Sequence, residues 1–77
     1  MGDDADRMRQ LEALAESAYD AMYDTHDRSS AAACYSDVKE CFREAIIVAR
    51  RIGAVEDAAR LEARLAHVKA VFRSQFT

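Results

Sequence analysis

The most reactive side chains in this sequence belong to two cysteines and two histidines, and their spacing limits the chemistry they could do. Cys34 and Cys41 would share one face of a helix at about 10.5 Å, by the 1.5 Å rise per residue, which is too far for a disulfide bond. His26 lies in a polar loop and His67 lies in a helical pattern, and neither belongs to a CxxC or HxxxH metal-binding pattern. We therefore predict no metal site and no cofactor, and two thiols that pack as small apolar residues.

The carboxylates are spaced for pairing on a helix surface. Several acids stand three or four residues from a cation, the separation at which helical side chains are neighbours. These pairs are Asp57 with Arg60, Glu56 with Arg60, and Glu40 with Arg43. The spacing places no serine, cysteine or histidine next to a general base that could activate it. The sequence also contains no glycine-rich phosphate loop. The sequence therefore predicts no catalytic residues and no enzyme.

Charge is distributed unevenly along the chain. Residues 1–27 hold eight acids and two arginines, a net charge of −6, whereas residues 28–77 hold nine cations and six acids, a net charge of +3. One interpretation is internal: an acidic first helix docks on two basic ones. The other is a basic surface for an anion, for which Arg60, Arg64 and His67 share one face at i, i+4 and i+7. The low isoelectric point, about 5.2, does not favour nucleic-acid binding.

Membrane and export signals are not visible in the chain. No apolar run approaches the roughly 20 residues that span a bilayer. The opening MGDDAD has neither the basic start nor the apolar stretch of a secretory signal. The chain shows no export signal, and two cysteines that cannot bridge each other fit a reducing compartment. We therefore predict a cytoplasmic protein.

Three helices are predicted to position these residues, over about 4–25, 29–52 and 55–75, in one all-α domain with an antiparallel up-down-up arrangement. There is no proline and only two glycines, which favours long helices with short connections. Apolar residues recur every three or four positions, as on one helix face. The first stripe is Met8, Leu11, Ala15, Ala18, Tyr19 and Met22. The second is Ala31, Cys34, Tyr35, Val38, Cys41, Phe42, Ala45, Val48, Ala49 and Ile52. The third is Ala58, Leu61, Leu65, Val68, Phe72 and Phe76. We expect nearly complete burial for Leu11, Val38, Phe42, Leu61, Leu65 and Val68.

Capping residues predict where the helices begin and end. Asp3 or Asp4 can cap the first helix, and Asp27, Ser29 or Ser30 can cap the second. A later start for the second helix, at Asp37 with Glu40 three residues on, is an alternative. The unbroken apolar stripe favours the earlier start. Gly53, directly after Arg50-Arg51-Ile52, predicts a left-handed helix end and a tight hairpin between the second and third helices.

Residues 40–72 resemble a tetratricopeptide-like helical hairpin. The run Cys41-Phe42-Arg43-Glu44-Ala45-Ile46-Ile47-Val48-Ala49-Arg50-Arg51-Ile52-Gly53 is similar to the second helix of such a repeat, and Ala59 through Phe72 is similar to the first helix of the next. This resemblance implies a binding scaffold.

Some apolar residues fall outside the predicted core stripes. At 100° per residue, Ile47 lies nearly opposite Ala45, and Val71 lies about 120° from Leu65. A second ridge on the third helix consists of Ala59, Ala63, Ala66 and Ala70. We interpret these residues as a second packing face, and predict a small interaction or regulatory module that binds a protein partner or itself. A small nucleic-acid-binding regulator is the alternative.

Overall fold

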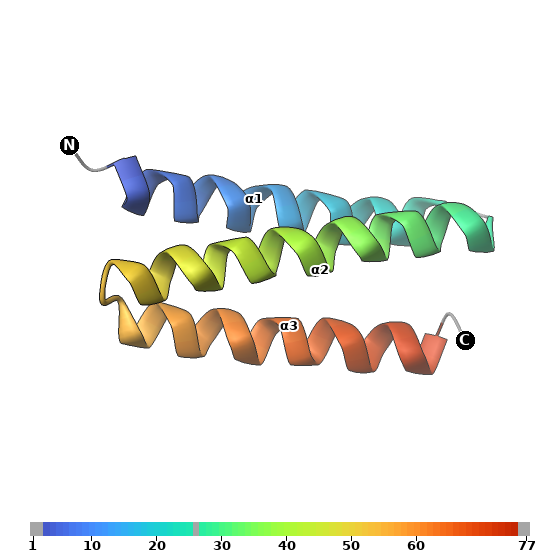
Figure 1. Ribbon diagram of the computed structural model, residues 1–77. Coiled ribbons are helices and arrows are strands. Elements are labelled where there is room, and N and C mark those ends of the chain that lie inside the picture. The colour runs from blue at the N-terminus through green and yellow to red at the C-terminus, as the bar shows by residue number, and fades with distance from the viewer. Residues whose placement is uncertain (1–2, 26, 76–77) are drawn as a thin grey trace.

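The computed structural model describes residues 3–25 and 27–75, and over these ranges the chain forms three α-helices. Helix α1 spans Asp3–Asp24, α2 spans Arg28–Arg51 and α3 spans Val55–Gln75. They run antiparallel, with α2 between the other two in a molecule of 41 × 20 × 13 Å (Figure 1). The predicted all-α, up-down-up bundle is confirmed, with helix bounds within one residue of those expected. No described helix is both long enough and apolar enough to cross a membrane.

The core forms where α2 meets its two neighbours. Helix α2 packs along both α1 and α3, whereas the backbones of α1 and α3 lie farther apart. Phe42, Val38 and Leu61 are completely buried at its centre. All six residues predicted to be nearly fully buried are at most 7% exposed, which confirms them. Because α2 touches two helices, its buried arc is wider than one stripe, and it includes Ile46, which the stripe omitted.

The connection between α1 and α2 confirms the earlier start of α2. Asp27 is the N-cap, with extended backbone (φ −105°, ψ 130°), and its side chain accepts a hydrogen bond from the Ser29 backbone N–H at 3.4 Å. The Ser30 hydroxyl also donates to Asp27, at 3.2 Å. The alternative start at Asp37 is wrong, because Asp37 lies well inside the helix.

The connection between α2 and α3 is a glycine-terminated helix end. Gly53 has φ +76°, as predicted. Its N–H donates to the Arg50 carbonyl at 3.1 Å, and the Ala54 N–H donates to the Ala49 carbonyl at 2.8 Å. This is the Schellman pattern, in which the residues after the helix bind carbonyls that have no partner inside it. Helix α3 begins directly afterwards, so α2 and α3 form the tight hairpin that was expected.

Three parts of the predicted stripes need correction. Ile52 is 40% exposed, because it is the C-cap residue and lies beyond the last turn of α2. Cys34 and Cys41 are half-buried and not fully buried, because they lie at the edge of α2 that faces α1. Ala18, Tyr19, Tyr35 and Phe72 are also half-buried, and the rings of Tyr35 and Phe72 stack with centroids 3.9 Å apart. Phe76 and His26 lie outside the described residues.

Candidate interaction surfaces

The predicted anion-contacting residues lie where α3 faces α1. Arg64 donates two hydrogen bonds to Glu16, from Nε at 2.9 Å and from Nη2 at 2.8 Å. Arg60 donates to both carboxylate oxygens of Glu12, and one of these bonds is 3.1 Å long. Arg60 also donates to Asp57 at 3.2 Å. The predicted pairing of Asp57 with Arg60 is thereby confirmed, whereas the predicted pairing of Glu56 with Arg60 is absent among the described residues. Two of the three residues are thus paired with carboxylates, and His67, the third, is exposed on α3.

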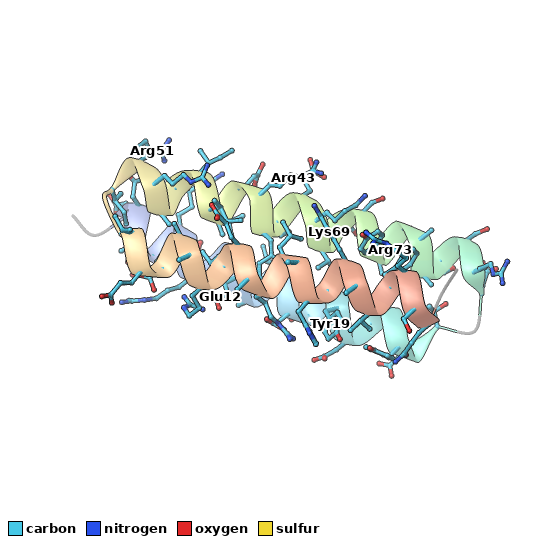
Figure 2. All side chains as sticks on the ribbon, turned by 90° about the horizontal axis from the view of Figure 1, so that it is seen from below. Glu12, Tyr19, Arg43, Arg51, Lys69 and Arg73 are labelled. Carbon is cyan, nitrogen blue, oxygen red and sulfur yellow. The ribbon has the colours of Figure 1, made fainter. Side chains whose placement is uncertain are left out.

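These contacts form a polar seam along α1 and α3. The hydrogen bond from Arg64 lowers the pKa of Glu16, and the bond to Glu12 raises the pKa of Arg60. The Arg64 guanidinium also lies over the Tyr19 ring, 4.9 Å from its centroid. Glu12 and Tyr19 are both on this side of α3 in Figure 2. Ion pairs of opposite charge therefore join α1 to α3, as the internal interpretation of the charge pattern expected for the third helix. Helix α1 nevertheless packs mainly on α2.

The predicted interaction face lies on the outside of α2 and α3. Ala59, Ala63, Ala66 and Ala70 are all exposed along α3, opposite its buried stripe. Ile47 is 60% exposed on α2. Val71 is half-buried and is turned about 100° from Ala70, so it does not belong to the ridge. The structure therefore separates Val71 from the other five residues.

Two exposed aliphatic residues were missed by the sequence reasoning. Val55 is 75% exposed, and it stands four residues before Ala59, so a spacing of four already placed it at the start of the alanine ridge. Leu14 is 58% exposed on α1. It follows Leu11 by three residues, which is a helical step, but it lies at the edge of the stripe and not in its centre.

The groove between α2 and α3 has a basic rim. Arg43, Ile46, Ile47, Arg50 and Glu62 line it. Arg50 pairs with Glu62, whereas Arg43 has no ion pair among the described residues. Figure 2 shows Lys69 and Arg73 on this same side, between α2 and α3. The cations therefore outnumber the single carboxylate in the groove.

The groove between α1 and α2 has the opposite charge. Leu14, Ala18 and Cys41 contribute its apolar lining, and Asp37, Glu40 and Glu44 contribute its rim. Within residues 3–25 and 27–75 these three acids make no ion pair, and the predicted pairing of Glu40 with Arg43 is absent. Burial and the three carboxylates together raise the pKa of the Cys41 thiol. Helix α2 thus separates an acidic groove from a basic one.

The described part of the chain contains no candidate metal site, because no three or more His, Cys, Asp or Glu side chains in it are placed to hold a metal ion. Comparisons with protein-family models, with curated proteins and with solved structures found no match for this chain. The resemblance of residues 40–72 to a tetratricopeptide-like hairpin therefore stays a prediction. The function must be inferred from the surfaces themselves.

Proposed function

We propose that this chain is a small helical protein-interaction module that binds a second copy of itself through one outer surface, which we call the α2–α3 face. Its residues are Arg43, Ile47, Arg50, Val55, Ala59, Ala63, Ala66, Lys69 and Ala70. The observation that carries the proposal is the exposure of Ile47 and Val55, at 60% and 75%, on the side of the hairpin that α1 does not cover.

The physical support is the free energy available from covering this surface. Removing one aliphatic side chain from water stabilises a complex by roughly 1.5–3 kcal/mol. A chain of 77 residues also has a limited core, so association adds stability that the monomer lacks. The exposed alanines let another helix approach closely, because the distance between packed helices depends on the side chains at the contact.

Charge supports a second copy as the partner. The rim of the α2–α3 face carries Arg43, Arg50 and Lys69, whereas the whole chain has a net charge of −3. Another copy therefore offers the face an acidic surface, which favours encounter and correct orientation.

The nucleic-acid alternative has less support. Its proposed contacts were Arg60, Arg64 and His67, and the first two are already bound to Glu12 and Glu16. An anion would have to displace these carboxylates, whereas nucleic-acid binding depends on cations available to neutralise phosphates.

A reducing, cytoplasmic location is part of the proposal. Cys34 and Cys41 are both unbridged thiols with part of their surface open to solvent. Such thiols are stable in a reducing compartment and are oxidised or bridged in an oxidising one.

The test is the mass in solution across the micromolar range, measured by sedimentation. We expect the wild-type mass to rise above the 8.6 kDa monomer with concentration, because two α2–α3 faces or a face and another surface are then covered. Ile47→Glu and Ala63→Glu should shift the mass toward the monomer, because each puts a charge into the contact.

The matched control is Ala13→Glu, which adds the same charge at an exposed alanine on α1. It should associate like the wild type, and circular dichroism should show equal helix content in all four proteins. A wild type that stays at the monomer mass throughout would make the proposal wrong. Retention of an oligonucleotide that weakens steeply with salt would favour the nucleic-acid alternative instead.

A further inference from the structure

We infer that the copies bind head to tail: the acidic groove between α1 and α2 of one copy receives the α2–α3 face of the next. The acidic groove is the surface lined by Leu14, Ala18, Asp37, Glu40, Cys41 and Glu44. This inference rests on the proposed function, and it names the surface of the second copy that the α2–α3 face contacts.

The first support is the separation of charge across α2. At 100° per residue, Asp37 and Glu44 lie on the edge of α2 toward α1, whereas Arg43 and Arg50 lie on the edge toward α3. These edges line two different grooves, one acidic and one basic. Asp37 and Glu44 are therefore held on one side of the helix and Arg43 and Arg50 on the other. Glu40 and Arg43 are neighbours at i and i+3, but they form no ion pair in this structure.

The second support is that other strong charges are already satisfied inside the bundle. Glu12 and Glu16 bind Arg60 and Arg64, and Asp4 binds Arg51 at 3.3 Å. By contrast, Asp37, Glu40, Glu44, Arg43 and Lys69 take part in no ion pair among the described residues. Each groove thus carries charges that no ion pair inside the bundle satisfies, and the two grooves carry opposite signs.

The third support is that each groove presents one exposed aliphatic side chain. Leu14 is 58% exposed at the acidic groove, and Ile47 is 60% exposed at the basic one. Apolar contact between them would exclude water from the surrounding ion pairs, which strengthens the attraction between opposite charges. Each groove therefore supplies both parts of a complementary contact.

The same charges argue against a symmetric dimer made by two identical faces. A two-fold contact sets each surface against its own copy. Arg43 and Lys69 would then meet cations, and Asp37 and Glu44 would meet acids. The head-to-tail contact sets acid against base, and it leaves one acidic groove and one α2–α3 face uncovered at the ends, so association continues with concentration without a fixed end point.

The experiment uses two charge-reversed variants of the full chain. The groove variant carries Asp37→Lys and Glu44→Lys, and the face variant carries Arg43→Glu and Lys69→Glu. Alone, each should associate at least about tenfold more weakly than the wild type, because like charges now meet. Mixed, the intact groove of the face variant should receive the intact face of the groove variant. The reversed groove of one variant and the reversed face of the other are also opposite in charge, so both contacts can form in the mixture. Sedimentation should then show that association is restored, with a mass that rises with concentration as it does for the wild type.

A second readout identifies the surface that is covered. The two variants differ in mass, so alkylation of Cys41 can be measured separately on each by mass spectrometry. In the mixture, Cys41 of the face variant should react more slowly than in that variant alone, because its acidic groove is occupied. Cys41 of the groove variant should also slow in the mixture, because its reversed groove meets the reversed face of the other variant. The matched control for charge is Asp20→Lys with Asp24→Lys, two exposed acids of α1, which should associate like the wild type.

The outcomes separate this inference from the proposed function. A wild type that associates, with a mixture of the variants that stays monomeric, overturns the head-to-tail contact and leaves self-association in place. Association of the groove variant at the wild-type strength also overturns it. A monomeric wild type removes the proposed function itself. Circular dichroism on each variant shows whether the helices are intact, and Arg43→Glu alone replaces the face variant if half-buried Lys69 proves necessary for folding.

Discussion

Helix α3 is held against its two neighbours by different forces. Toward α2 it buries Leu61, Leu65 and Val68. Toward α1 it presents Arg60 and Arg64, whose carboxylate partners lie on a partly exposed surface. Apolar burial contributes much more free energy than exposed ion pairs, which typically contribute less than about 1 kcal/mol each. The comparison indicates that the apolar side supplies stability, whereas the ionic side aligns α1 with α3 and neutralises charge.

The largest expected effect is on the apolar side. Leu65→Ala should lower the free energy of unfolding by about 2–5 kcal/mol, because it removes buried methyl groups and leaves a cavity. Leu65 is 7% exposed. A urea melt of the variant measures the loss, with the exposed His67→Ala on the same helix as the control. A loss below about 0.5 kcal/mol would contradict the assignment of this residue to the core.

A smaller loss of stability is expected at Gly53, in the tight turn that connects α2 to α3. Gly53→Ala should cost about 1 kcal/mol, because φ is +76° there and a side chain is strained in that conformation. An added Cβ would meet no atom within 4 Å, so the cost comes from the backbone alone. Gly53→Asn should cost less, since asparagine tolerates left-handed backbone better. Equal melting temperatures for the wild type and Gly53→Ala would show that the left-handed conformation at Gly53 imposes no cost on alanine.

The ionic side should give a still smaller, pH-dependent effect. Glu16→Gln should destabilise the protein by less than about 1 kcal/mol, because the pair with Arg64 is partly exposed and screened. The pKa of Glu16 is lowered in the folded protein, so its contribution is complete above the unfolded pKa of about 4.5 and is lost as the pH falls through the folded pKa.

Chemical denaturation at neutral pH and at low pH measures this contribution. The wild type and Glu16→Gln should differ at neutral pH and should converge at the acidic end, and added salt should narrow the neutral difference. A difference that persists unchanged below the folded pKa would show that the substitution acts through packing and not through charge.

The smallest expected effect is on the reactivity of the two thiols at the edge of α2 that faces α1, where the acidic groove lies. In dilute solution Cys34 and Cys41 should both be alkylated more slowly in the native protein than in the unfolded one, because both are half-buried. Glu44→Gln should accelerate Cys41, by less than about tenfold, because removing a carboxylate lowers a thiol pKa that this carboxylate helps to raise. Equal native and unfolded rates for both thiols would indicate that neither is protected by the fold.

Local features of the sequence were sufficient to predict the helices and the core. Apolar residues spaced by three and four define one face of a helix wherever they occur. Asp27 begins α2 because its side chain caps the helix, and Gly53 ends it because a residue without a side chain adopts the left-handed conformation easily. These preferences act over a few residues, so they can be read without knowing where the rest of the chain lies. The exposure of Ile47 could be predicted for the same reason.

Only the tertiary structure decided which charges are satisfied and which surfaces are open. Glu12 and Arg60 are 48 residues apart, and they meet only because α1 and α3 settle on α2 in one particular register. The burial of Ile46 beside exposed Ile47 likewise depends on α2 touching two helices. The half-burial of Cys41 depends on how closely α1 approaches. Register, rotation and helix separation are set by packing over the whole bundle, and a pattern within one helix carries no information about them.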